Sequence, residues 1–450
     1  MSIPARTSGK PRPAMTAGRG RAGTDWHRVA NAVVLVYLAA TVILLPLHAA
    51  GIIQRWTVVH VLLLGAVTNA IVTWTVHFTT AMLHAPSPGP VLTVLRLIGL
   101  NLGVLGILTG IGHGFPAVTL VAGTVFAAAI VIHLVALSRM TKRGLGGRFT
   151  AAVRFYRAAP YALFAGMTAG VVMGIGAGGP WYEHIYAAHL SLNLLGWVGL
   201  TVLGTLFLLW PTVLGARMAD GAMRAARRAL PLCVAGLTLA AVGMLAASGP
   251  VAAAGLVLYL VGAVVSLVPA FQAKWRRVFE RPAALMLAAA VVWLLVGLGV
   301  EAVAAFTAPD PAELSDRISG MLPWFLAGFV VQILVGSLTH LLPIVLGRMR
   351  PGGSPATRLV NWLGRTRTVA ANLGVALVAL PLPGAADVLG WTLVTVSLGG
   401  FVVLATAVYA TRKRDPMAPA GGIGRPRRGP HALELGLFSR SRAPSTRHLL

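Results

Sequence analysis

The chain is made of apolar runs of about 20 residues, separated by short segments that hold most of its basic residues. As a helix, a run of this length crosses the roughly 30 Å hydrocarbon core of a bilayer. With 57% hydrophobic and 11% charged residues, the composition is that of an integral membrane protein. We therefore expect an all-α fold, a polytopic membrane helical bundle of about twelve transmembrane helices. These helices are predicted near residues 29–53, 56–83, 91–112, 115–138, 158–178, 185–211, 229–248, 251–271, 283–306, 321–346, 368–383 and 386–410.

The basic segments occupy alternate loops of this twelve-span arrangement. They precede the first span and follow the fourth, sixth, eighth, tenth and twelfth, whereas only Arg55 and Arg317 are basic in the opposite loops. Because cytoplasmic loops are enriched in Lys and Arg, both termini are predicted to be cytoplasmic. The formal net charge of +26 thus follows membrane topology, so that the expected partner is the lipid bilayer and not nucleic acid.

Two basic segments flank the predicted membrane domain of residues 29–410. Residues 1–28 and 411–450 are rich in glycine, proline and arginine, and the first lacks the apolar core of a cleavable signal peptide. We expect both to be disordered cytoplasmic tails that contact anionic lipid. The predicted location is a bacterial plasma membrane, crossed many times.

An internal repeat is visible in the predicted sixth and tenth spans. The stretch from Gly204 to Gly215 matches the stretch from Gly336 to Gly347, with a glycine at the start, a proline near the end and a following basic residue. We interpret this match as duplication of a helical unit. The alternative is chance similarity within a biased composition.

Nine of the twelve histidines lie in the apolar runs or at their edges, namely His48, His60, His77, His84, His113, His133, His184, His189 and His340. Ionisable side chains within a bilayer are costly, so they indicate functional sites. Imidazole is also the commonest protein ligand of haem iron and copper. The single cysteine, Cys233, argues against iron–sulfur clusters and disulfides.

At about 1.5 Å per residue along a helix, the predicted topology sorts these histidines into two tiers. His60 and His189 share the outer level, close to the interfacial His113, and His77 and His340 share the inner level with His133. Two imidazoles at matched depth are what axial ligation of haem b requires. We therefore predict cofactor ligation by His60, His77, His189 and His340, and we extend the candidate metal ligands to His113 and His133. Polar packing inside the bundle is the alternative for the deep histidines, and the remaining three, including His27, are predicted to be incidental.

Other polar groups inside the spans have two interpretations each. Glu301 either relays protons or reaches water from the end of its helix. Asn69, Asn101, Asn193 and Gln332 either line a polar path or bond one helix to another. Glycines near the histidines are predicted to leave room for a flat macrocycle, namely Gly65, Gly196, Gly199, Gly204 and Gly336.

Three segments resemble a known family. They are His60-Val-Leu-Leu-Leu-Gly65-Ala-Val-Thr-Asn-Ala-Ile, His189-Leu-Ser-Leu-Asn-Leu-Leu-Gly196-Trp-Val, and His340-Leu-Leu-Pro343. Together they resemble the twelve-span haem-copper oxidase subunit I superfamily. They resemble more closely its divergent NnrS-like relatives and the membrane domains fused to bacterial multicopper oxidases.

The resemblance implies haem b, with copper as a second cofactor, and a role in electron transfer, respiration or nitrogen-oxide metabolism. It assigns His60, His189 and His340 as the ligands of the second, sixth and tenth spans, and a cupredoxin-type oxidase as a redox partner. The sequence departs from the family because it has no adjacent His-His pair and no His-Pro-Glu-Val-Tyr stretch. His340 also lies nearer the cytoplasm than the family's tenth-span ligands. Oxygen reduction is therefore not expected.

Three functions stay open on the sequence alone. The first is a haem-binding membrane redox protein, which the matched histidines favour. The second is a transporter or channel for a metal ion or small molecule, which the internal repeat and the prolines of the sixth and tenth spans favour. The third is a membrane scaffold without a cofactor that partners an oxidase.

Overall fold

The computed structural model describes residues 17–147, 149–272, 275–346, 354–380 and 382–410. Over these residues the chain is helical and contains no strand, which confirms the all-α prediction. Ten of the described helical stretches are long and apolar enough to cross a membrane, as a polytopic bundle requires. They are Trp26–Ala49, Arg55–Leu83, Pro90–Gly112, Pro116–Arg143, Gly179–Leu214, Ala222–Leu245, Gly249–Ala270, Pro282–Thr307, Trp324–Val345 and Gly384–Tyr409.

The other two predicted spans are helical but differ from these ten. Helix α6 (Thr150–Gly174) is less apolar, because Arg154 and Arg157 lie in its first turns. Helix α16 (Gly364–Ala379) has only 16 residues. The count of twelve spans and the cytoplasmic placement of both termini stay predictions.

The first helix begins earlier than the sequence analysis expects. Helix α1 (Ala17–Ala49) starts within the segment 1–28 that is predicted to be a tail. The rest of that tail, residues 1–16, and the tail predicted for 411–450 lie outside the described residues.

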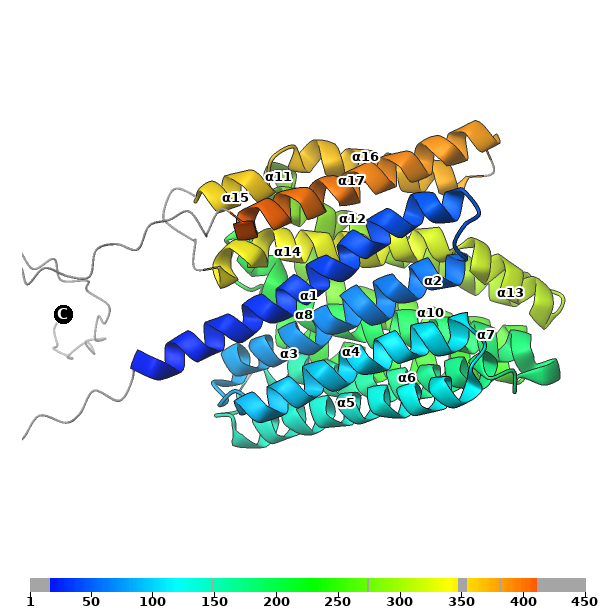
Figure 1. The fold of residues 1–450 in the computed structure, drawn as a ribbon, viewed down its shortest axis with the longest axis horizontal. Coiled ribbons are helices and arrows are strands. Elements are labelled where there is room, and N and C mark those ends of the chain that lie inside the picture. The colour runs from blue at the N-terminus through cyan, green and yellow to red at the C-terminus, as the bar shows by residue number, and fades with distance from the viewer. Residues whose placement is uncertain (1–16, 148, 273–274, 347–353, 381, 411–450) are drawn as a thin grey trace, which may run out of the picture. The chain divides into compact units, whose positions relative to one another are not determined.

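The helices follow one another in three units of the same order (Figure 1). Each unit has a straight helix, then a helix containing a π-helical segment, then two further helices. The first unit is α1, α2 (Arg55–His60) with η1 (Val61–Val67) and α3 (Thr68–Leu83), α4 (Pro90–Gly112) and α5 (Pro116–Arg143). The second is α6, α7 (Tyr182–Ser191) with η3 (Leu192–Gly199) and α8 (Leu200–Leu214), α9 (Ala222–Leu245) and α10 (Gly249–Phe271). The third is α12 (Pro282–Thr307), η4 (Trp324–Val331) with α14 (Gln332–Val345), α16 and α17 (Gly384–Ala410).

Short helices fill the connections. They are η2 (Gly179–Trp181), α11 (Trp275–Glu280), α13 (Pro311–Gly320) and α15 (Pro355–Val360). The last two helices of each unit pack closely through glycines. A Cβ on Gly103 would lie 2.7 Å from Phe126 Cβ, and one on Gly374 would lie 2.6 Å from the carbonyl oxygen of Gly390.

The three π segments share a glycine and a valine two residues later. These are Gly65-Ala-Val67, Gly196-Trp-Val198 and Gly328-Phe-Val330. Counted from these glycines, Gly204 and Gly336 occupy the same position in the second and third units. The structure thus supports the predicted duplication and extends it to a third unit.

Side chains satisfy backbone groups around the π segments, as is required inside a bilayer. Thr68 Oγ1 donates to the carbonyl of Leu63 (2.8 Å), and Tyr259 Oη donates to that of Leu195 (2.7 Å). Asn69 bonds Asn101 of α4 by two amide hydrogen bonds of 3.0 and 3.2 Å.

Gln332 stands at the position of Asn69 in the third unit and bonds Asn372 of α16 in the same way, at 3.0 and 3.1 Å. For Asn69, Asn101 and Gln332 the structure shows bonding between helices, whereas Asn193 donates to the carbonyl of His189 in its own helical stretch (2.7 Å).

Candidate functional site

The structure brings together the two histidines predicted for the outer level. His60 ends α2, directly before η1, and His189 lies on α7, shortly before η3. Their ring centroids are 6.3 Å apart and their planes differ by 25°. We call these two residues the histidine pair.

Both rings of the histidine pair are held by main-chain carbonyls. His60 Nδ1 lies 2.8 Å from the carbonyl oxygen of Trp56, and His189 Nδ1 lies 2.7 Å from that of Gly166 on α6. A carbonyl oxygen only accepts, so both Nδ1 atoms carry the proton and donate it. Each Nε2 therefore keeps a lone pair, and within the described residues neither Nε2 has a hydrogen-bond partner. This is the tautomer of a metal-ligating histidine.

Neighbouring residues fix the positions of the two rings. The indole of Trp56 stacks on His60, with centroids 4.4 Å apart and planes 26° apart. Gly170 of α6 faces His189 so closely that a Cβ there would lie 2.7 Å from the ring's Cε1. The absence of a side chain at Gly170 thus lets the imidazole lie against the α6 backbone.

The histidine pair offers two nitrogen donors, and this number decides which metal centre it suits. Haem supplies four nitrogens of its own and takes two axial ligands, whereas protein zinc and copper sites mostly use three or more side chains. Two imidazoles on opposite sides of one metal, with bonds of about 2 Å, have their ring centres about 6 Å apart. Over the described residues, no group of three or more His, Cys, Asp or Glu is placed to hold a metal. The donor set and the ring separation therefore fit haem.

The glycines predicted to leave room for a macrocycle instead serve helix packing. Gly65 lies against the ring of Tyr37, and Gly196 lies against Ala162 and Leu237. Gly204 packs on Phe155, and Gly336 packs on Met286. Gly199 faces the hydroxyl of Tyr259.

His77 has a different partner from the one expected. It does not face His340 but His27 of α1, with His77 Nδ1 3.3 Å from His27 Nε2 and ring centroids 4.8 Å apart. Trp74 lies beside both rings and donates to Asn31 Oδ1 (3.2 Å), and Asn31 Nδ2 in turn donates to the carbonyl of His27 (2.6 Å).

The sequence analysis dismissed His27 because it placed this residue in a tail. The available signal was the spacing of His27 and Asn31, which lie on one face of a helix if α1 starts before residue 27. The partner on α3 could not be inferred from that spacing.

His133 is fully buried and both of its ring nitrogens are engaged. Thr75 Oγ1 donates to the carbonyl of Ile71 (2.6 Å) and so accepts from His133 Nε2 (3.3 Å). On the other side, Arg96 Nη1 donates to His133 Nδ1 across 3.5 Å. This arrangement leaves no lone pair for a metal. We call His27, His77, Arg96 and His133 the arginine cluster.

The structure does not bring the remaining predicted ligands to the histidine pair. His340 lies on α14 with a buried Nε2 that has no partner among the described groups. His113 is exposed at the end of α4, where its Nδ1 donates to Thr109 (3.0 Å) and its ring stacks on Phe115.

Glu301 is enclosed by protein. Its side chain is on α12 with only 2% of the residue's surface exposed, and Ser191 Oγ donates to its Oε1 (3.0 Å). Ser191 directly precedes η3 and lies two residues after His189. This carboxyl group is therefore buried between helices and does not extend into water from the end of α12.

No protein-family model matches this chain, and no curated protein is significantly similar to it. The resemblance to the haem-copper oxidase subunit I superfamily stays a prediction.

Proposed function

We propose that this chain is a multi-pass membrane redox protein that binds haem b through His60 and His189. The observation that carries the proposal is the shared state of the two imidazoles. Both donate Nδ1 to a main-chain carbonyl, both have an Nε2 without a hydrogen-bond partner among the described residues, and their ring centroids are 6.3 Å apart.

Bound haem supplies a one-electron ferric–ferrous couple at this position. The chain's own residues orient the ligands. The carbonyls of Trp56 and Gly166 fix the ring rotation and make each Nε2 a stronger donor, and the stacked Trp56 indole restricts His60 further. Haem held by both His60 and His189 would serve electron transfer and not substrate binding.

The wider role belongs to the same proposal. A bacterial plasma membrane protein of this kind would pass electrons in a respiratory or nitrogen-oxide pathway to a soluble or membrane partner, such as a cupredoxin-type oxidase. Copper would need donors beyond the histidine pair. Transport and a cofactor-free scaffold stay the alternatives.

The test is a reduced-minus-oxidised absorption spectrum of detergent-purified protein, with iron and copper analysis of the same sample. We expect a b-type band and one iron per chain, and loss of both in His60→Ala and in His189→Ala. His113→Ala is the matched control, because His113 is an exposed histidine of the same bundle that does not contact the pair. Protein of ordinary stability that holds no haem after expression with haem supplied would refute the proposal and favour the alternatives.

A further inference from the structure

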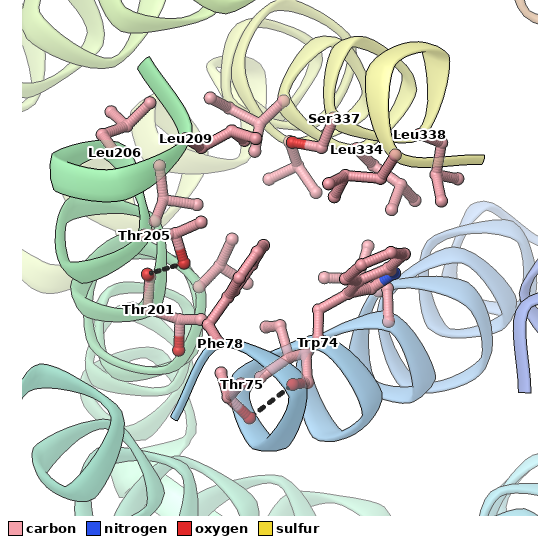
Figure 2. A pocket seen from close by; sticks show the side chains of 18 of the residues that line it. Trp74, Thr75, Phe78, Thr201, Thr205, Leu206, Leu209, Leu334, Ser337 and Leu338 are labelled. Atoms are coloured by element: carbon pink, nitrogen blue, oxygen red, sulfur yellow. Dashed lines mark hydrogen bonds between the residues drawn. The ribbon is translucent and has the colours of Figure 1, made fainter. Parts of the chain in front are cut away.

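A partly open cavity lies between the three helices that follow the π segments. It has a volume of about 80 Å³ and is lined by α3, α8 and α14, with Leu287 of α12 completing the wall. Figure 2 shows the rings of Trp74 and Phe78 on one side and Leu334 and Leu338 on another. Neither His60 nor His189 lines it.

The three helices line the cavity with equivalent residues. In the first unit the lining residues are Val67, which ends η1, and Ala70, Ile71, Trp74, Thr75 and Phe78 of α3. They stand two, five, six, nine, ten and thirteen residues after Gly65, and the lining residues of the second and third units stand at the same six positions after Gly196 and Gly328. The cavity therefore lies where the three repeated units meet, so it is a product of the repeat and not a local packing defect.

The three threonine hydroxyl groups in the wall each donate their proton to a main-chain carbonyl of their own helix. Thr75 donates to the carbonyl of Ile71 (2.6 Å), Thr201 to that of Trp197 (2.7 Å), and Thr205 to that of Thr201 (2.8 Å; Figure 2). A buried water needs two to four polar partners, and these hydroxyl protons are already donated to main-chain carbonyls. Ser337 is the one other hydroxyl in the wall, so water gains little by entering.

The wall also excludes ions. Each described residue that lines the cavity is uncharged, and most are Val, Ile, Leu, Ala or aromatic. An apolar wall offers water few partners and favours small apolar guests such as xenon. We propose that this cavity is a binding site for a small, uncharged, apolar molecule of the size of a dissolved gas. The proposal stands on the cavity alone and does not depend on haem binding.

Crystals of the full chain pressurised with xenon test the proposal, because xenon scatters anomalously and is itself an apolar guest. We expect one xenon peak between α3, α8 and α14 in the wild type. Ala70→Leu puts three further carbon atoms into the cavity and should abolish the peak. Ala81→Leu adds the same atoms at an exposed position of α3 and should leave the peak unchanged.

If Ala70→Leu does not fold, Ser337→Leu fills the cavity from α14 and is expected to abolish the peak in the same way. Three results would overturn the proposal. These are no xenon in the wild type, ordered water or lipid density in its place, or a peak that persists in a folded filling variant.

Discussion

The histidine pair and the arginine cluster place the same kind of side chain in the same kind of bundle, but they leave it in different chemical states. In the pair, main-chain carbonyls take both Nδ1 protons and each Nε2 stays free. In the cluster, His77 faces His27, and His133 is bonded on both nitrogens by Thr75 and Arg96. Burial is therefore a poor guide to ligation, and the partner of each ring nitrogen is a better one.

The largest expected difference between the two regions is in haem content. His60→Ala and His189→Ala each remove one of the two proposed haem ligands, so the haem-to-protein ratio should fall at least about tenfold. His77→Ala and His133→Ala should leave it near the wild-type value, since these rings are engaged elsewhere. The ratio is measured by pyridine haemochrome assay on purified protein. Equal haem loss from variants of both regions would show that the histidine pair does not bind haem differently from the arginine cluster.

Within the arginine cluster the expected effects are on stability. Arg96 is only 4% exposed, its Nε has no partner among the described groups, and its Nη1 donates to His133 across 3.5 Å. Replacing a poorly compensated buried charge with an apolar residue is often stabilising, so Arg96→Met should raise the free energy of unfolding by about 1–3 kcal/mol. His133→Leu removes the acceptor and leaves the guanidinium, and should lower it by about 1–3 kcal/mol.

Chemical unfolding of the two variants in detergent measures both changes. The two changes in the free energy of unfolding should have opposite signs. General disruption of the core would instead destabilise both variants. A destabilised Arg96→Met would mean that the guanidinium has a stabilising anionic partner in the purified protein.

The sequence correctly predicted the features of the fold that depend on hydrophobicity and on the direction of each span. Apolar runs predicted the long helices, and counting the spans placed His60 and His189 at one level, which the 6.3 Å separation of their rings agrees with. Counting levels failed for His77, because level does not specify which neighbouring helix a ring faces. His77 faces His27, which lies on a helix because α1 starts before residue 27. The composition of residues 1–28 had predicted a tail there instead.

The π segments were also beyond the sequence analysis. A π segment shifts hydrogen bonds from the fourth to the fifth preceding residue, and no residue type requires that change. The glycines show the same limit. Their spacing suggested room for a cofactor, whereas Gly65 and Gly196 are in fact filled by neighbouring side chains and only Gly170 meets a ring of the histidine pair.

Gly170 offers a finer test of the histidine pair, since it contacts His189, a proposed ligand, but has no side chain that could bind a metal itself. In Gly170→Ala the new Cβ would lie 2.7 Å from His189 Cε1, so the ring must turn away from its carbonyl partner. We expect about a tenfold weaker haem affinity and a changed low-spin electron paramagnetic resonance spectrum. Gly299→Ala is the control, because nothing lies within 4 Å of a Cβ there and alanine favours the helix. An unchanged spectrum in Gly170→Ala would show that His189 does not ligate in this orientation.

The smallest expected effect concerns the π segment beside the histidine pair. Tyr259 donates to the carbonyl of Leu195 within η3, so Tyr259→Phe leaves that buried carbonyl without this bond and should cost about 1 kcal/mol of stability. The matched control is Tyr161→Phe, at a residue that is 63% exposed on α6, where no change is expected. Because η3 begins three residues after His189, Tyr259→Phe should also broaden the haem resonance spectrum, while the arginine cluster keeps its geometry. Loss of stability without any change in the haem spectrum would show that the π segment serves packing and not the alignment of the ligand.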